Sequence, residues 1–468
     1  MKKNSINIIW IYVNLLFFII GFIFYDNNNF YIILSLIGAI QLISSIIIYK
    51  KSGENLLSPL IIYVIVMYLF LFGQCLMWLI TKNFDGRSII QIYSKNEIIK
   101  AQIFTLFCFF FFHLACFNVN NSYVVDNSSL NNKIYNAISM TGLFLLFFSF
   151  IPEIIYNVRL FIIAYTQGYM GIYSNQASGL FLKFLTLREF FFPSLVLIYV
   201  GDYKNNKLIF IKKLLTFIII IDVLIGFYVG SRADAIMQLL VLLLLKNTLS
   251  NNNISRISYV KYAIVLFALL SIINVVRVVR IESNKTISSY INAIASNTHN
   301  GLITSTMGEM GGSMSTCIET MNLVPNYFPY KYGTSYLYSF TWLLPASISG
   351  DLIEKASMNN WIDSVRYTGS GWGFSTTGEA FYNFGYYGVF VFLIFGFFVG
   401  KFFKGLNHSL ILKKPLELAL SFILFSRLLI FSRIDFLSTL PSIFYFYICI
   451  KIIVILFYLY LNRWKEKS

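Results

Sequence analysis

Long apolar blocks constrain this chain more than any other feature of its sequence. The blocks are about twenty residues long, which is the length that an α-helix needs to cross the hydrocarbon core of a bilayer. Only 12% of the residues are charged, whereas Asp, Glu, Lys and Arg make up roughly a quarter of an average soluble protein. These observations exclude a water-soluble globular enzyme and predict an all-α, polytopic integral membrane protein.

About twelve spans are expected, and the lysines orient them. The expected spans are residues 6–25, 30–49, 56–80, 100–118, 134–155, 179–201, 208–229, 231–247, 257–279, 378–400, 415–432 and 440–461. Lysines gather in alternate connecting loops, and the cytoplasmic loops of membrane proteins are enriched in Lys and Arg. The sequence therefore predicts that both termini are cytoplasmic. This topology explains the net charge of +16 without a nucleic-acid partner.

One long polar stretch divides the chain into three expected regions. Residues 280–377 are too many for a simple connector and are rich in Gly, Ser, Thr, Tyr and Trp. They should form a large extracytoplasmic loop between an N-terminal bundle of about nine spans (1–279) and a C-terminal bundle of about three spans (378–468). Aromatic rings stack on sugar faces and hydroxyl groups pair with sugar hydroxyls, so this composition favours sugar binding. An ordinary outer cap on the helices would have the same composition.

Arginine is distributed differently from lysine in this topology. Seventeen lysines fall on the inner side, but only two of the eleven arginines do so, Arg256 and Arg463. The other nine map to the outer side or to outer span ends: Arg87, Arg159, Arg188, Arg232, Arg277, Arg280, Arg366, Arg427 and Arg433. The positive-inside rule counts the two residue types equally, whereas guanidinium groups grip phosphate through paired hydrogen bonds.

An outward-opening cavity for a lipid pyrophosphate follows as a hypothesis. Its expected substrate-binding arginines are Arg159, Arg232, Arg277, Arg280, Arg427 and Arg433. The alternative for each residue taken singly is an interfacial anchor, whose long side chain reaches toward the membrane surface.

The turn between the seventh and eighth expected spans is the sharpest local feature. Ser231 and Asp234 have the spacing of a capping box, which predicts that a helix begins at Ser231. Arg232 would then lie at a helix N-terminus, where backbone N–H groups also favour anions. Asp222 is an acid inside an apolar span, a position that is unfavourable unless the residue is paired or functional. We expect Asp222 to contribute to substrate binding; a structural Asp222–Arg232 pair is the alternative.

Transfer of a glycosyl group to a sugar hydroxyl needs a base for the proton and cations for the leaving pyrophosphate. The candidate catalytic bases are Glu309, which the small residues at 308–312 would let approach the substrate closely, and His299, the only histidine on the expected outer side. The other histidines, His113 and His408, map to other depths or sides, and no cysteine pair has the spacing of zinc ligands. We therefore expect no metal and no other cofactor.

Four short stretches of the chain carry a family resemblance. They are Gly168-Tyr169-x3-Tyr173, Gly230-Ser231-Arg232, Pro325-x4-Tyr330-x2-Gly333-x-Ser335-Tyr336 leading to Pro345, and Gly378-Glu379-Ala380-x-Tyr382-x-Phe384-Gly385-x2-Gly388. With these stretches and its topology the chain resembles the Wzy-type oligosaccharide repeat-unit polymerases of O-antigen and capsular polysaccharide synthesis. We expect Tyr336, in the third stretch, to bind substrate.

The resemblance implies a metal-independent glycosyltransferase of lipopolysaccharide or capsule biosynthesis in the bacterial inner membrane. It would transfer a growing glycan from undecaprenyl pyrophosphate onto a new lipid-linked repeat unit at the outer face. Both donor and acceptor would be undecaprenyl-pyrophosphate-linked oligosaccharides, and a chain-length regulator protein would be a partner.

Three other classes are weighed against this one. A lipid-linked oligosaccharide flippase should have short loops on both sides and often has similar halves, which the long polar loop argues against. An O-antigen ligase shares an arginine-lined site and a large outer loop, but its acceptor is lipid A-core. A metal-dependent polyprenyl-phosphosugar transferase usually has acids in its first outer loop, which here is only Asp26 followed by three asparagines.

Overall fold

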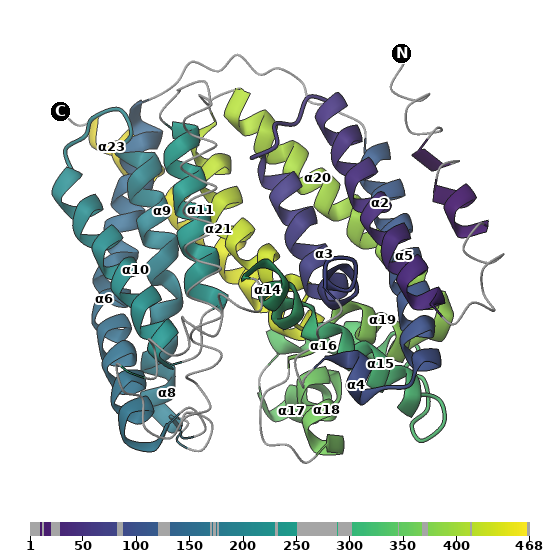
Figure 1. The fold of residues 1–468 in the computed structure, drawn as a ribbon. Coiled ribbons are helices and arrows are strands. Elements are labelled where there is room, and N and C mark those ends of the chain that lie inside the picture. The colour runs from purple at the N-terminus through teal and green to yellow at the C-terminus, as the bar shows by residue number, and fades with distance from the viewer. Residues whose placement is uncertain are drawn as a thin grey trace. The chain divides into compact units, whose positions relative to one another are not determined.

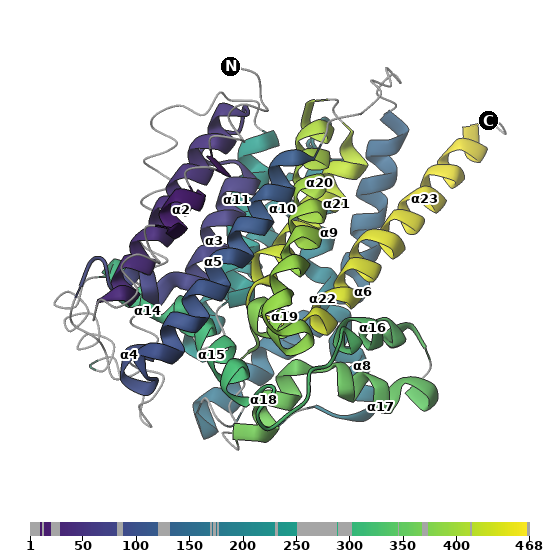
Figure 2. The same cartoon turned by 90° about the vertical axis from the view of Figure 1, so that its right-hand side faces the viewer.

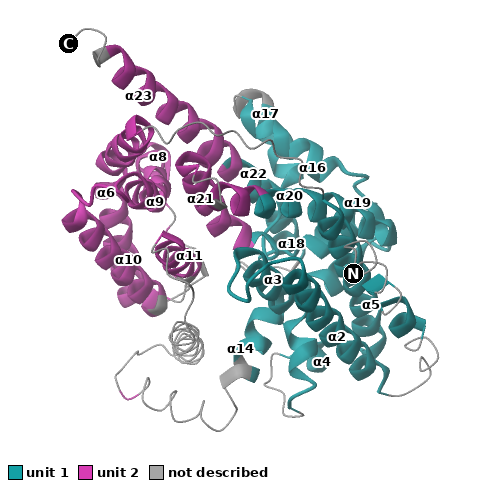
Figure 3. Cartoon of the chain, turned by 90° about the horizontal axis from the view of Figure 1, so that it is seen from above, with its two compact units in different colours: residues 1–122, 303–404, 431–441 teal, residues 123–302, 405–430, 442–468 magenta. Residues whose placement is uncertain are grey.

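A computed structural model describes most of the chain (Figures 1 and 2). The described residues are 10–11, 14–19, 29–81, 88–119, 132–168, 171, 175, 177–229, 233–249, 288, 302–344, 346–366, 373–411 and 414–465. Helices are the only regular elements among them, which confirms the all-α fold class. The chain divides into two compact units, each built from separate stretches of sequence (Figure 3).

Unit 1 comprises residues 1–122, 303–404 and 431–441. Its long helices are α2 (Phe30–Lys51), α3 (Pro59–Met77), α5 (Lys95–Asn118) and α20 (Val391–Ile411), the last continuing beyond the unit. Its short elements are α4 (Ile89–Ile92), α14 (Leu302–Met310), η2 (Gly311–Ser313), α15 (Met314–Leu323), α16 (Thr334–Ser339), η3 (Phe340–Leu343), α17 (Ala346–Ala356), α18 (Met358–Arg366), α19 (Thr376–Phe384), η4 (Gly385–Phe390) and α22 (Phe436–Ile443). The helices α2, α3 and α5 pack against one another (Figure 1).

Local sequence explains where the long helices of unit 1 begin. The Ser58 hydroxyl accepts a hydrogen bond from the Ile61 amide, and Pro59 occupies the first helical position of α3, where its missing N–H costs nothing. Helix α5 begins with a capping box, in which the Ser94 and Glu97 side chains each accept from the other residue's backbone amide.

Unit 2 comprises residues 123–302, 405–430 and 442–468. Its elements are α6 (Asn132–Gln167), α8 (Gly179–Thr186), η1 (Leu187–Phe190), α9 (Phe191–Gly201), α10 (Ile209–Val229), α11 (Ala233–Leu249), α21 (Pro415–Phe431), the π-helical segment η5 (Phe444–Cys449) and α23 (Ile450–Lys465). Helices α6 and α9 form its most extensive contact, and a β-carbon on Gly142 or Gly201 would lie within 3.0 Å of atoms of the facing helix. Small residues of this kind let membrane helices approach closely.

Among the described residues, six helical stretches are long and apolar enough to cross a membrane: Phe30–Lys51, Pro59–Met77, Lys95–Asn118, Asn132–Gln167, Thr376–Leu410 and Phe436–Arg463. All six coincide with expected spans, and the polytopic membrane class is thereby supported. Helices also occupy the expected spans 179–201, 208–229, 231–247 and 415–432, although none meets the same combined standard of length and composition. The expected spans 6–25 and 257–279 lie largely outside the described residues. The total of twelve stays a prediction.

The boundary of one expected span differs from the structure. The sequence predicts a span that ends near residue 155, but α6 continues through Pro152 to Gln167 and has 36 residues. Glu153 and Arg159 therefore lie on one helix. Six residues at about 100° per residue amount to a rotation of about 600°, which leaves the two side chains about 120° apart around the helix axis, so they face different surroundings.

Candidate functional site

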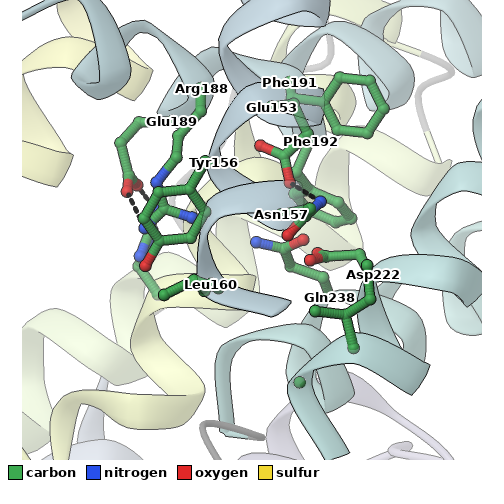
Figure 4. Close-up of a pocket in the computed structure, with 13 residues that line it drawn as sticks. Glu153, Tyr156, Asn157, Leu160, Arg188, Glu189, Phe191, Phe192, Asp222 and Gln238 are labelled. Carbon is green, nitrogen blue, oxygen red and sulfur yellow. Dashed lines mark hydrogen bonds and ion pairs between the residues drawn. The ribbon is translucent and has the colours of Figure 1, made fainter. Parts of the chain in front are cut away.

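A polar pocket lies inside unit 2, among helices that cover almost three hundred residues of sequence. It is lined by Glu153, Tyr156, Asn157, Leu160, Arg188, Glu189, Phe191, Phe192, Asp222, Ile225, Gly226, Gln238 and Arg427 (Figure 4). These residues come from α6, η1, α9, α10, α11 and α21. The empty space among these residues, open solvent at its mouth included, is about 630 Å³.

The pocket lies far from the lysine-rich end of unit 2. At that end Lys204 Nζ is 3.5 Å from Asn132 Oδ1 at the start of α6, and Lys212 Nζ is 2.7 Å from Asp202 Oδ2. Burial by itself would raise the pKa of Asp202, but the hydrogen bonds from Lys212 and from two backbone amides outweigh it and hold the pKa below its usual value. Glu153 follows Asn132 by 21 helical residues, or about 30 Å at 1.5 Å per residue.

Two arginines converge on one carboxylate at one side of the pocket. Arg188 Nη2 lies 3.3 Å from Glu189 Oε1, and Arg427 donates to Glu189 Oε2. The Arg188 guanidinium is stacked on the Tyr156 ring, with 3.4 Å between Cζ and the ring centroid, and Arg427 lies 5.2 Å from the centroid of Phe446. Stacking holds a guanidinium flat, with its N–H groups in the plane. The two groups hold the Glu189 carboxylate between them.

Acids and amides line the other side of the pocket. Glu153 and Asn157 stand one turn apart on α6, with 4% and 6% of their surfaces exposed, and Asn157 Nδ2 donates to Glu153 Oε1 at 3.2 Å. Asp222 of α10 and Gln238 of α11 face them (Figure 4). Asn157 Oδ1 is buried and accepts no hydrogen bond from the described residues. This side is rich in hydrogen-bond acceptors.

The third and fourth family-like stretches meet in unit 1. The Ser335 hydroxyl donates to Glu379 Oε1 at 2.8 Å, and Asn383 Nδ2 donates to Ser335 Oγ at 2.7 Å. The other Glu379 oxygen accepts from the Phe436 backbone amide at 2.8 Å. Glu379 is 1% exposed, so these contacts form a buried polar network that fixes α16 and the start of α22 against α19.

Three of the predicted site residues, Tyr336, Arg433 and Glu309, belong to unit 1. Tyr336 is half-buried beside Phe384 and Phe436, and its buried hydroxyl has no hydrogen-bond partner among the described residues. Burial raises the pKa of Tyr336 well above its usual value. Arg433 lies 5.9 Å from the ring centroid of Phe70.

Glu309 is the residue before the last in helix α14, and Gly311, which follows this helix, packs against α3. A β-carbon on Gly311 would lie 2.2 Å from the backbone nitrogen of Gln74 in α3, and Gln74 Nε2 donates to the Gly308 carbonyl at 2.8 Å. The small residues around Glu309 therefore allow a close helix crossing, whereas the sequence interpretation assigned them to substrate approach.

Of the remaining predicted site residues, two join the pocket of unit 2. Asp222 and Arg427 line it. Arg159 does not, because it lies on another side of α6, where it donates to the Asn175 carbonyl at 2.5 Å and lies 5.4 Å from the Phe181 ring centroid. Arg232, Arg277, Arg280 and His299 lie outside the described residues.

Sequence reasoning missed five charged or amide residues of the pocket: Glu153, Asn157, Arg188, Glu189 and Gln238. A signal existed for three of them. Glu153 is an acid inside an apolar stretch, and Arg188 directly precedes a second acid at the start of the apolar run 190–200; ionisable residues in such positions indicate functional sites. Asn157 and Gln238 carry no charge, and their positions in the sequence do not indicate that they line one pocket.

Metal ligation has no support among the residues that the structure describes, since no three or more His, Cys, Asp and Glu side chains are grouped to hold an ion. His113 is buried in unit 1, where its ring nitrogens lie 2.9 Å and 3.2 Å from the hydroxyls of Tyr49 and Tyr68.

The helices and the pocket define a multi-pass membrane protein with a pocket of arginines, acids and amides among the helices of unit 2. The family model of the O-antigen polysaccharide polymerase Wzy matches residues 6–466, nearly the whole chain. The chain therefore belongs to this family, and its function is that of an O-antigen repeat-unit polymerase acting on lipid-linked repeat units in the membrane. Comparisons with curated proteins and with solved structures gave no match.

Proposed function

We propose that the pocket of unit 2 binds the pyrophosphate of an undecaprenyl-pyrophosphate-linked donor while its glycan is transferred. The observation that carries this proposal is the convergence of Arg188 and Arg427 on a single carboxylate, that of Glu189. A phosphate oxygen is an acceptor of the same charge and similar geometry as a carboxylate oxygen. Glu189 thus holds the two guanidinium groups ready for an anionic substrate.

Charge development explains why arginines are needed here. When the anomeric carbon of the donor leaves its pyrophosphate, negative charge grows on the bridging oxygen. Preorganised cations at that point stabilise the transition state more than the ground state. No step requires a metal in this account, and we propose that the transferase is metal-independent.

The lysines of unit 2 are the basis for proposing which face of the membrane the pocket opens toward. The lysine-rich end of unit 2, with Lys204 and Lys212, would face the cytoplasm by the positive-inside rule. The pocket, about 30 Å along α6 from that end, would then open toward the outer face of the inner membrane. Twelve spans, cytoplasmic termini and an outer loop at 280–377 complete this proposal, and a chain-length regulator would be its partner.

Other predicted residues are proposed to contribute to the same reaction. Arg159, Arg232, Arg277, Arg280, Arg433 and Tyr336 would help to bind the lipid-linked glycans, and Glu309 and His299 are the bases that the sequence proposes. For Arg159 the contact with the Asn175 carbonyl supports a role in holding Asn175, two residues after the first family-like stretch, against α6.

Deletion of the gene, followed by gel analysis of surface polysaccharide, tests the proposed function. The deletion strain should carry single repeat units at the surface, and the intact chain should restore a ladder of long polymers. Absence of even single units would indicate a flippase or a ligase and would contradict the proposal. Complementation with Arg188→Gln should give single units, whereas Arg463→Gln, an exposed arginine near the end of α23, should restore the ladder.

A further inference from the structure

The acid and amide side of the pocket has no role in holding a pyrophosphate, because two carboxylates would repel it. Glu153 lies on α6 and Asp222 on α10, both long and largely apolar helices, and Asn157 and Gln238 accompany them. Ionisable side chains at such positions are retained when they serve a function. The cluster therefore needs a ligand of its own.

The unused hydrogen-bonding capacity of Asn157 indicates the chemistry of that ligand. Asn157 Oδ1 is buried without a donor among the described residues, and Figure 4 shows the Asn157 amide between Glu153 on one side and Asp222 and Gln238 on the other. Carboxylates and amide oxygens accept hydrogen bonds, and amide N–H groups donate them. A neutral molecule with several hydroxyl groups satisfies both kinds of partner.

Aromatic rings next to the cluster favour a sugar over other polyols. Tyr156, Phe191 and Phe192 line the same pocket. Rings that present an apolar face beside a few placed polar groups are typical of specific small-molecule sites. The C–H face of a pyranose packs against such a ring while its hydroxyl groups reach the acids and amides.

We propose that Glu153, Asn157, Asp222 and Gln238 form the subsite for the acceptor sugar, and that Glu153 is the catalytic base. The inference rests on the proposed function, in which the arginine side of the same pocket holds the donor pyrophosphate. It replaces Glu309 and His299 in the role of base. Asn157 is a positioning residue, because its Nδ2 donates to Glu153 Oε1 and so orients the carboxylate.

The proposed reaction transfers the glycan from the donor pyrophosphate to the acceptor hydroxyl in a single displacement. The acceptor hydroxyl gives its proton to the Glu153 carboxylate, and its oxygen forms a bond to the anomeric carbon of the donor. The bond between that carbon and the pyrophosphate oxygen breaks, and its electron pair leaves with undecaprenyl pyrophosphate. Arg188 and Arg427 hold the resulting charge, and the proton on Glu153 returns to water before the next cycle.

Glu153→Gln tests the base directly, because glutamine keeps the shape and can accept the Asn157 hydrogen bond but cannot take a proton at this step. General base catalysis typically contributes about 10²- to 10⁴-fold. With purified variants and lipid-linked repeat units, we expect the polymerisation rate of Glu153→Gln to fall by at least about 100-fold, with unchanged binding of the repeat unit. Glu417→Gln is the matched control, since Glu417 pairs with Lys451 at 2.9 Å and does not line the pocket, and should retain the wild-type rate.

Two further variants separate the base from a structural role. Glu153→Ala should regain part of its activity when formate is added, because formate can enter the vacated space and accept the proton; a purely structural glutamate would show no such rescue. Asp222→Asn should raise the KM for the acceptor more than it lowers kcat. If Glu153→Gln fails to accumulate, Glu153→Asp keeps the carboxylate and should fold and retain measurable activity.

The outcomes distinguish this inference from the proposed function. A wild-type rate in Glu153→Gln, or no formate rescue in a well-folded Glu153→Ala, would overturn Glu153 as the base and leave the polymerase function intact. Failure of the wild-type chain to join lipid-linked repeat units would instead overturn the proposed function.

Discussion

Replacement of Arg427 by lysine tests the anion-holding side of the pocket quantitatively. Arg427 donates to Glu189 and lies 5.2 Å from the ring centroid of Phe446. Lysine keeps the positive charge but offers no planar pair of donors and no flat face for the ring. The variant should therefore retain the attraction for an anion and lose the two-point grip.

The expected loss follows from the value of one charge-assisted hydrogen bond, about 1.5–3 kcal/mol. At about 1.4 kcal/mol for each factor of ten, this corresponds to about a 10- to 150-fold fall in kcat/KM for the donor. Because the leaving pyrophosphate gains charge in the transition state, kcat should fall as well as donor affinity.

Steady-state kinetics of purified Arg427→Lys, with Arg463→Lys as the matched control, measure this loss. Arg463 is exposed near the end of α23, so its variant should behave as the wild type. If the kcat/KM of Arg427→Lys fell by no more than about twofold, that small fall would refute the role of Arg427 in binding the pyrophosphate, because the expected fall is about 10- to 150-fold. Circular dichroism and yield from the membrane should be unchanged.

Three other predictions can be checked independently. Polymerisation should continue in a metal chelator, and abolition that a single metal ion reverses would refute metal independence. Reporter fusions should place Asn360 outside and His408 inside, and an inside signal at Asn360 would overturn the proposed topology. The double variant Asp222→Asn with Arg232→Gln should fold yet stay inactive if both residues act on substrate. If the two residues are instead a structural pair, removing both charges together should largely restore activity, because neither charge then remains buried alone. Long polymers from the double variant would therefore show that they are a structural pair.

Sequence alone was sufficient for the fold class and the family. Apolar blocks of about twenty residues predict membrane helices because a helix rises 1.5 Å per residue through a core about 30 Å thick. Six such helices are present in the part of the chain that the structure describes. Asp222 was recognised for a related reason, since an acid in an apolar span needs a partner or a function. It lines the pocket.

The composition of the pocket was beyond the reach of the sequence. Its polar residues run from Glu153 to Arg427, and they meet only because particular faces of α6, α10, α11 and α21 are turned toward one another. The expected positions of the arginines on the outer side of the membrane selected nine candidates. They did not distinguish Arg188, which lines the pocket, from Arg159, which lies on another side of α6.

Tertiary packing also joins motifs that the sequence presents separately. Ser335 and Glu379 belong to two family-like stretches more than forty residues apart and share a buried hydrogen bond of 2.8 Å. The glycines beside Glu309 show the opposite case, in which a pattern attributed to substrate binding serves a helix crossing with Gln74. In both cases the deciding contact is with a residue far away in the sequence.

The most direct test of the central claim is the product formed by the purified chain in liposomes that contain only undecaprenyl-pyrophosphate-linked repeat units. Gel or mass analysis of the lipid-linked glycans should show a ladder of two, three and more repeat units, and Arg188→Gln should abolish the ladder. Persistence of single repeat units with the folded wild-type chain, whether unchanged or merely moved to the other leaflet, would contradict the account.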